Sequence, residues 1–408
     1  MRLAFSDTAA TVEVPECPRF LAALQAAAPD WPFRRVRSSD PPAAEVGKRN
    51  GRYVIKLPEE EEIEASAVAA ACSVICDVAM AFADERPDQL SLHCAAVLVA
   101  GRLVVMPSRS HAGKSTLVAR LAADGHAVFG DDMLLVDRQD EHGIALGVAP
   151  RLRLPLPRHA GDAFAAFVAR HSGARDRRYL YLDMPPSLLA RRGDIAPVGA
   201  VVLLDRQAEG PARLWRAPAN AAIQALIRQN VTLCAAPADL LRRAAALIGR
   251  VPCLTMAYSD LDEAAALFRA TFSQWPLRID PSLPVRPYRL DAEQAARLKA
   301  ESRATGGAAA KVPVRLFAAG QAMLRHPDVV LQLTDREAFL AGGGGRSILH
   351  LNETGMGLWN LLAAPVSELE AVEALAAAFP DAERMAIERD VAAVFLAFAE
   401  AGMIVPAR

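Results

Sequence analysis

The chain has 408 residues, a formal net charge of −1 and a hydrophobic content of 52%, which together indicate two or three globular domains with an ample core. The near-zero net charge excludes a global attraction to nucleic acid or to an anionic membrane. Its six cysteines form no Cys-x-x-Cys pair, and the first residues do not read as a signal peptide. We therefore expect a protein of the reducing cytoplasm without structural disulfides.

Residues 1–57 predict a mixture of strands and turns that ends in a strand over 52–57. A long helix over 60–84 is expected next, because Pro58 and a run of glutamates favour a helix start. Its part over 65–83 is almost long enough to span a bilayer. Asp77 lies near the middle and alanine dominates, so the pattern favours a soluble core helix and no membrane.

A loop that resembles a phosphate-binding loop lies between a buried strand over 103–106 and a helix over 115–121. The loop and the first helical residues are Ser108, Arg109, Ser110, His111, Ala112, Gly113, Lys114, Ser115 and Thr116. Such a joint directs backbone N–H groups and the helix dipole at an anion. Lys114 would reach the outer phosphates of ATP, and the Ser115 hydroxyl would hold Mg²⁺. The strict pattern has glycine where this chain has Ser108, which fits only with a negative φ; the alternative is a chance strand–turn–helix joint.

Two adjacent carboxylates follow the next short strand, over 127–129. If this strand runs parallel to the one before the loop, Asp131 and Asp132 emerge at the same sheet edge. One would hold magnesium and the other would accept a proton from an attacking hydroxyl; the alternative is a solvated aspartate-rich turn. His93 precedes a strand over 95–99 that should form a hairpin with residues 103–106. From the residues alone, His93 is either structural or catalytic.

These motifs resemble the HPr kinase/phosphorylase-related family. The resemblance rests on the segments 92–96, 106–117, 125–126 and 130–132, which carry the histidine, the loop, a Gly-His pair and the aspartate pair. It implies an α/β P-loop kinase domain of the HPr kinase-like type over residues 1–275, with a nucleotide core over 92–137. It also implies catalytic roles for His93, Lys114 and Asp131, nucleotide binding by the loop, and magnesium near Ser115 and Asp132. Ser108 and His111 stand where the founding enzymes have glycines.

The region from 151 to 178 is rich in arginine, with seven arginines against two acidic residues. It is either a solvated basic face or a clamp for phosphate or for an acidic acceptor. Strands over 198–204 and 253–257 and helices over 219–228, 239–248 and 260–272 are expected to complete the domain. Prolines and glycines then mark residues 276–313 as a linker, with a short helix over 291–303.

Residues 314–408 predict a separate α+β module of the winged-helix type. Strands are expected over 329–333, 338–340 and 347–351, with a flexible turn over 342–345. Helices should follow over 353–362, 366–379 and 385–401, with Asn352 as the first N-cap and Pro380 ending the second helix.

From about residue 322 this module resembles the PqqD family, whose members recognise ribosomally made peptides that are later modified. The resemblance rests on residues 351–354, Trp359, 390–391 and 402–404. It implies that a leader peptide adds as an extra strand beside the third strand, against the last helix. The implied contacts are Ser347, Ile348, Leu349, His350, Leu351, Arg389, Ala393 and Leu396. A DNA-reading winged helix is the alternative, but basic residues are sparse after Arg346.

Together the two resemblances predict an ATP- and Mg²⁺-dependent kinase that phosphorylates a hydroxyl, most simply serine, of a captured precursor peptide. Two alternatives remain: a non-catalytic nucleotide switch that delivers a peptide to a modifying enzyme, and a kinase of a free small-molecule hydroxyl. Other peptide-modifying enzymes are expected partners, whereas nucleic acid and membranes are not. Homo-oligomerisation stays open, because HPr kinase relatives are often oligomeric and nothing in this sequence demands it.

Overall fold

A computed structural model of the chain is a mixed α/β structure that falls into two compact units. One unit comprises Met1–Ala235 and Ala246–Arg286, and the other comprises Ala236–Ala245 and Pro287–Arg408. The structure describes residues 1–56, 62–108, 112–138, 141–157, 160–232, 235–277, 279–280, 282–285, 317–318, 320–335, 337–342 and 347–407. The expected helix over 291–303, most of the linker and most of the 342–345 turn lie outside these residues.

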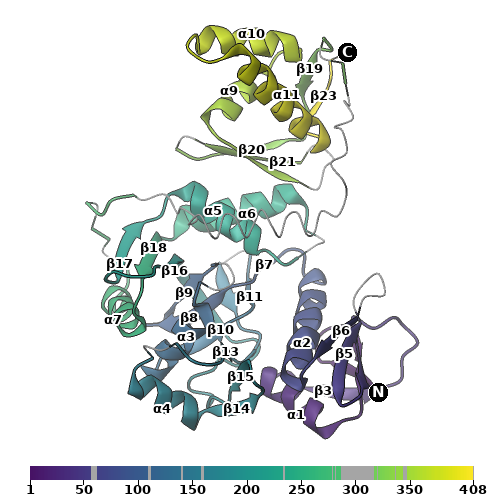
Figure 1. The fold of residues 1–408 in the computed structure, drawn as a ribbon, viewed down its shortest axis with the longest axis vertical. Helices are drawn as coiled ribbons and strands as arrows, with labels where there is room; N and C mark the ends of the chain where they lie inside the picture. The colour runs from purple at the N-terminus through teal and green to yellow at the C-terminus, as the bar shows by residue number, and fades with distance from the viewer. Residues whose placement is uncertain are drawn as a thin grey trace. The chain divides into compact units, whose positions relative to one another are not determined.

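The first unit begins with a six-stranded sheet in the order β3-β1-β2-β4-β5-β6. Two helices, α1 (Pro18–Ala27) and α2 (Ala67–Asp84), pack together, and α2 also contacts β4 and β5 (Figure 1). The strands are β1 (Arg2–Phe5), β2 (Thr11–Glu13), β3 (Phe33–Val36), β4 (Ala44–Arg49), β5 (Arg52–Lys56) and β6 (Glu62–Ala65). Helix α1 was not expected from the sequence, which predicted only strands and turns before residue 57.

Helix α2 starts later than predicted, at Ala67 rather than at residue 60. Residues 62–65 form β6, which pairs with β5, and Glu64 bonds across the pair to Arg52. The helix begins at Ser66, whose hydroxyl accepts from the Ala69 N–H at 3.1 Å. Among the described residues, α2 alone is long and apolar enough to pass for a membrane span, and 61% of that window is buried inside the protein. This burial is what a core helix shows.

The centre of the first unit is a nine-stranded sheet in the order β10-β8-β9-β16-β12-β11-β7, extended from β16 by β18 and then β17. Strand β9 runs parallel to β16, and β16 runs parallel to β18, whereas the other pairs are antiparallel. The strands are β7 (Leu90–Leu92), β8 (Ala95–Val99), β9 (Arg102–Met106), β10 (Ala127–Gly130), β11 (Leu134–Val136), β12 (His142–Ile144), β16 (Ile195–Arg206), β17 (Arg213–Arg216) and β18 (Cys253–Tyr258).

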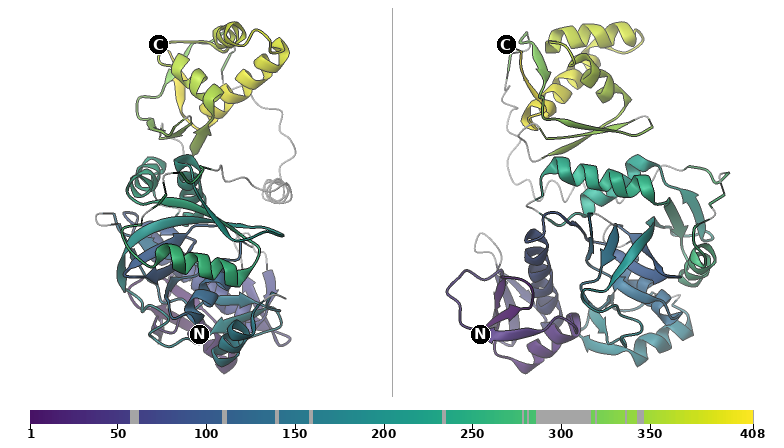
Figure 2. Two further views of the ribbon diagram at one scale, coloured as in Figure 1. Left: turned by 90° about the vertical axis from the view of Figure 1, so that its left-hand side faces the viewer. Right: turned by 180° about the vertical axis from the view of Figure 1, so that it is seen from behind.

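Helices α3 (Lys114–Ala123) and α7 (Leu261–Phe272) pack side by side against this sheet (Figure 2). Asp260 caps α7 by accepting from the N–H groups of Asp262 and Glu263. Helices α5 (Ala219–Gln229) and α6 (Pro237–Arg250) lie between β17 and β18 in the sequence. A small three-stranded sheet has the strand order β13-β15-β14 and consists of β13 (Arg151–Arg153), β14 (Ser172–Arg175) and β15 (Tyr179–Leu182). Helix α4 (Asp162–Arg170) lies between β13 and β14 in the sequence.

The second unit contains a three-stranded antiparallel sheet, β20-β21-β22, and three helices around a compact core. The elements are β20 (Val330–Leu333), β21 (Ala338–Ala341), β22 (Ile348–Leu351), α9 (Glu353–Leu361), α10 (Glu368–Ala378) and α11 (Arg384–Glu400). Asn352 caps α9 as expected, accepting from the Gly355 N–H at 2.9 Å. Two short strands that the sequence did not predict, β19 (Met323–Arg325) and β23 (Ile404–Pro406), pair the two ends of this module.

Candidate functional site

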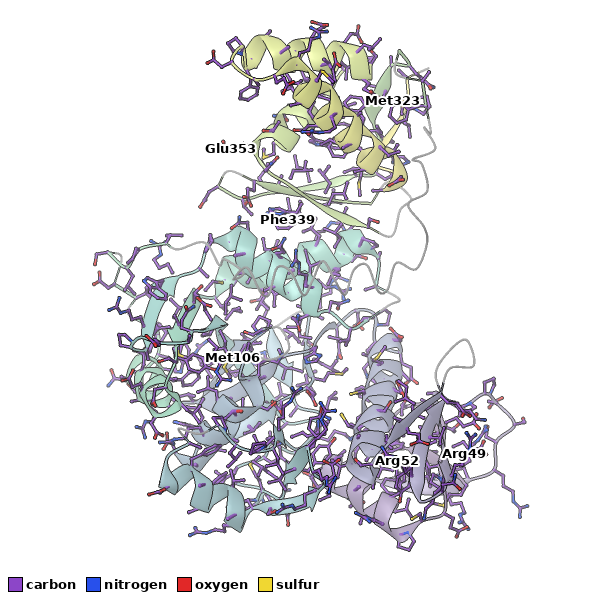
Figure 3. All side chains as sticks on the ribbon, viewed as in Figure 1. Arg49, Arg52, Met106, Met323, Phe339 and Glu353 are labelled. Carbon is purple, nitrogen blue, oxygen red and sulfur yellow. The ribbon has the colours of Figure 1, made fainter. Side chains whose placement is uncertain are left out.

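Three segments of the first unit meet at one edge of the nine-stranded sheet. Strand β8 lies between β9 and β10 and runs antiparallel to both, pairing Ala95 with Met106 and Ala96 with Gly130. The end of β9, the start of β8 and the end of β10 therefore share one edge. Figure 3 labels Met106, the last residue of β9, within this unit. The sequence predicted that β9 and β10 point the same way, and they do, although β8 separates them.

The loop after β9 reaches α3 through a glycine that no other residue could replace without strain. Gly113 has φ +87°, a left-handed conformation, and is the N-cap of α3. A Cβ on Gly113 would overlap the Tyr258 hydroxyl. That hydroxyl, at the end of β18, donates to the Ala112 carbonyl at 2.9 Å. Arg109, Ser110 and His111 lie outside the described residues, so only Ser108, Ala112, Gly113, Lys114, Ser115 and Thr116 of the loop can be placed.

Ser108, which departs from the strict loop pattern, is accommodated without a strained backbone. It is buried, and its φ does not fall in the left-handed region. Its hydroxyl accepts a hydrogen bond from the Leu204 N–H at 2.9 Å, which ties the loop to β16. The serine thus has a structural role at a position where the loop pattern has glycine.

Lys114 is buried at the first position of α3, and its Nζ donates to the Ser108 carbonyl. Burial lowers the pKa of Lys114, while the charges of Asp131, Cys94 and Asp132 act in the opposite direction. The N-cap of α3 is Gly113, which has no side chain that could cap the helix. A buried ammonium group and a helix N-terminus that begins at a glycine together form a site suited to an anion.

Asp131 is the most deeply buried acidic group at this edge. Its Oδ2 accepts from the Arg151 N–H at 3.0 Å, while its Oδ1 is buried and has no hydrogen-bond partner among the described residues. Burial and the charge of Asp132 raise the pKa of Asp131 to about 7, against the Arg151 N–H, the Ser115 hydroxyl and the charge of Lys114. An unpartnered carboxylate oxygen with such a pKa suits a proton acceptor near neutral pH.

His93 and Asp132 lie beside this pair. The His93 Nε2 is 3.9 Å from the Asp132 Oδ1, and the His93 backbone N–H donates to the Gln229 carbonyl at 2.7 Å. Burial and the positive charge of Lys114 lower the pKa of His93, and Asp132 acts to raise it. The structure therefore brings His93, Lys114, Asp131 and Asp132 together. The motif spacing predicted this for Lys114 and the two aspartates, whereas for His93 only the resemblance implied it.

The described residues contain no group of three or more His, Cys, Asp or Glu side chains arranged to hold a metal ion by themselves. A cation at Ser115 and Asp132 would thus need further oxygen ligands from a bound nucleotide, which is the usual situation for Mg²⁺. Asp131 Oδ1, which has no partner among the described residues, the helix N-terminus at Gly113 and the buried Lys114 fit a metal–nucleotide complex.

Sequence reasoning missed two residues of this site, Arg151 and Tyr258. Arg151 was noted only as one of seven arginines, yet its backbone N–H holds Asp131. Tyr258 ends β18, a strand that reaches the loop through its parallel pairing with β16. The available signal for Tyr258 was that the carboxyl ends of parallel strands meet at one edge.

In the second unit, the predicted peptide-binding strand is an edge strand. Within the described residues β22 pairs with β21 alone, so its other side is open to an added strand. His350 stacks on Phe339 with ring centroids 4.7 Å apart, and its Nε2 lies 2.6 Å from the Glu337 Oε2. Ser347 directly precedes this strand. The implied contact residues of the module are otherwise Ile348, Leu349 and Leu351 on β22 and Arg389, Ala393 and Leu396 on α11.

On α11 the core-facing residues are Ile387, Val391, Phe395 and Phe398. Arg389 and Ala393 are exposed and Leu396 is half-buried, so these three do not belong to the buried stripe. They are available to a ligand, and their role in peptide binding stays a prediction.

Comparison with known proteins gave one family match and no match among curated proteins. The match is to PqqD, described as Coenzyme PQQ synthesis protein D, and it covers residues 337–404, from β21 to β23. It does not extend to the unit that carries Lys114 and Asp131. The C-terminal part of this chain, residues 337–404, is a PqqD domain, a domain type that serves as a peptide-recognition element.

Proposed function

We propose that this protein phosphorylates a ribosomally synthesised precursor peptide, which its PqqD domain holds by the leader. PqqD-type domains bind precursor peptides, which supports the choice of partner. The observation that carries the kinase proposal is the meeting of Lys114, Asp131 and Asp132 at one sheet edge, where Asp131 Oδ1 has no hydrogen-bond partner in the described part of the chain. The resemblance to HPr kinases adds support for the same reaction. We also propose that the protein acts in the cytoplasm.

In the proposed reaction, a peptide hydroxyl attacks the γ-phosphorus of ATP. The new O–P bond forms as the bond between the γ-phosphorus and the ADP oxygen breaks, and the hydroxyl proton passes to Asp131. Lys114 and the N–H groups of the loop and α3 stabilise the charge on the transferring group. Mg²⁺, held by Ser115 and Asp132, would neutralise phosphate charge when bound. His93 lies 3.9 Å from the Asp132 carboxylate and would share in the reaction as the resemblance implies.

The test is to incubate the chain with ATP, Mg²⁺ and its cognate precursor and to weigh the peptide by mass spectrometry. The peptide should gain one phosphoryl group. Lys114→Ala should lower turnover by about a thousandfold, since a charged contact to the transition state is lost. Lys56→Ala, which removes an exposed lysine of β5, is the matched control and should keep the wild-type rate. Unchanged peptide mass, or a normal rate in Lys114→Ala, would remove the kinase proposal.

A further inference from the structure

One face of the small sheet carries a row of arginine and tyrosine side chains. Strands β13 and β15 pair with Arg151 opposite Tyr181 and Arg153 opposite Tyr179. The residues between them, Leu152 and Leu180, are buried on the opposite face. Because side chains alternate along strands, both arginines and both tyrosines point to the same side of the sheet.

Three guanidinium groups gather around the ring of Tyr179. Their carbons lie 4.4 Å (Arg151), 5.9 Å (Arg153) and 5.9 Å (Arg178) from the ring centroid. At these distances the aromatic ring attracts each cation and limits its freedom. The arginines are therefore held in position rather than spread through solvent.

None of these three arginines forms an ion pair with a described residue. The nearby carboxylate of Asp176 already accepts from the backbone N–H groups of Arg178 and Tyr179, at 2.6 and 2.7 Å, and from the Ser66 hydroxyl. The charges of Asp132 and Asp176 act on Arg151, but no described carboxylate lies within ion-pair distance of the three guanidinium groups, so a bound anion would reduce their mutual repulsion. The chain thus presents positive charge with fork-shaped donors, the geometry that carboxylates favour.

This cluster lies next to the sheet edge that carries Asp131. The backbone N–H of Arg151 holds Asp131 at 3.0 Å, and Arg153 lies two residues further along β13, about 7 Å away at the rise of a strand. An extended peptide with its hydroxyl at Asp131 would therefore bring side chains two to four residues away over Tyr179.

We propose that Arg151, Arg153 and Arg178 around Tyr179 form the acceptor subsite, and this proposal rests on the proposed function. The subsite binds carboxylate side chains of an acidic peptide segment that flanks the phosphorylated hydroxyl. The nucleotide is served by Lys114 and the α3 N-terminus, so this second cationic group is left for the acceptor. The subsite selects peptides by charge near the reacting hydroxyl, and this selection is separate from leader recognition by the PqqD domain.

The test measures binding of three dye-labelled peptides to the full chain by fluorescence anisotropy at fixed physiological salt. Each peptide has one serine, flanked on both sides by Glu, by Gln or by Lys. The Glu peptide should bind on the order of tenfold more tightly than the Gln peptide, as expected for charge-assisted hydrogen bonds, and the Lys peptide should bind most weakly. The double variant Arg153→Gln/Arg178→Gln should lose the preference for Glu.

Arg177→Gln is the matched control, because Arg177 is the exposed neighbour of Arg178 and is not among the arginines around Tyr179. It should keep the preference for Glu. Equal binding of the Glu and Gln peptides, or an equal loss in Arg177→Gln, overturns the subsite. A competition assay adds a further check. If a single-stranded oligonucleotide displaces the Glu peptide with the same affinity from wild type and from every variant, the site is a general anion surface and the subsite proposal is overturned.

Phosphoryl transfer to the cognate precursor, measured separately, distinguishes the two proposals. If the chain discriminates between the Glu and Gln peptides but transfers no phosphoryl group, the kinase proposal is wrong and a carboxylate-binding surface remains. Transfer without discrimination overturns the subsite and keeps the kinase.

Discussion

Asp131 has two carboxylate oxygens in unlike surroundings. The Arg151 N–H holds one, and the other is buried without a partner among the described residues. Buried polar atoms of this kind cost stability and are retained mainly where they serve function. The same carboxylate can therefore be tested through its effect on folding, independently of any reaction.

Asp131→Asn should stabilise the nucleotide-free protein more at pH 8 than at pH 5. The folded-state pKa of about 7 exceeds the unfolded value of 3.8, so the folded protein holds this proton more tightly. That contribution is complete below the unfolded pKa and is lost as pH rises through about 7. Between pH 5 and pH 8 the wild-type protein therefore loses about 2–3 kcal/mol of its free energy of unfolding, and the Asp131→Asn variant does not.

Thermal unfolding at the two pH values, in chelator, measures this effect. Asp88→Asn, in the exposed turn after α2, is the control and should match wild type at both. A pH-independent difference between Asp131→Asn and wild type would contradict the raised pKa. The same variant should bind ATP normally and transfer no phosphate.

Ser108→Gly should destabilise the protein even though it restores the glycine of the strict loop pattern. It removes the hydrogen bond from the Leu204 N–H and adds backbone freedom to the unfolded chain. Ser108→Ala should cost about 1 kcal/mol and Ser108→Gly more, measured by urea unfolding. A glycine variant as stable as wild type would show that the serine has no structural role.

At the scale of elements, the start of α2 shows why sequence patterns mislocate boundaries. The glutamates before residue 66 suggested a first helical turn, but they face arginines across strands: Glu62 pairs with Arg49 and Glu64 with Arg52. Local propensity favoured helix, and strand pairing between residues distant in sequence prevailed. By contrast, α7 and α9 agree with the prediction, because Asp260 and Asn352 mark their starts by contacts within one turn.

The same contrast holds for the candidate site. Lys114, Asp131 and His93 could be found because Lys114 begins a helix and the other two adjoin strands, and local patterns reveal these elements. Arg151 and Tyr258 were missed, because their contacts to Asp131 and Ala112 join residues 20 and 146 positions apart and only the pairing of parallel strands pointed to Tyr258. The strand order, with β8 between β9 and β10, was likewise not readable from spacing.

Ser66→Ala should lower stability by about 1–2 kcal/mol. The variant loses the N-cap of α2 and the bond to Asp176, which links α2 to the turn before β15. Ser73→Ala, inside the same helix, is the matched control and should be neutral or slightly stabilising. Chemical denaturation compares the two, and equal effects would mean that the cap does not matter.

At the scale of the whole molecule, recognition is divided between two units of one chain in the proposed function. The PqqD domain would hold the leader, and the sheet edge with Lys114 and Asp131 would then meet a substrate at an effective concentration in the millimolar range. The catalytic edge itself can therefore bind the acceptor weakly.

Cleaving the precursor between leader and core should raise the KM for the core by roughly 100-fold and leave kcat unchanged. Adding the free leader should not restore the KM, because the link between the two parts is gone. Steady-state kinetics on intact and cut precursor measures this, with a scrambled-leader precursor as the control. An unchanged KM for the cut core would favour a kinase of free acceptors.

The position of β8 has a consequence for how this protein tolerates change in its chain length. Because β8 lies between the strands that lead to the loop and to the aspartate pair, residues added at Gly125, in the turn after α3, should leave the positions of Lys114 and Asp131 unchanged. Removing a single residue from β8 would exchange the side chains on its two faces and shift both neighbours. Natural length variation should therefore collect in that turn and avoid the strand.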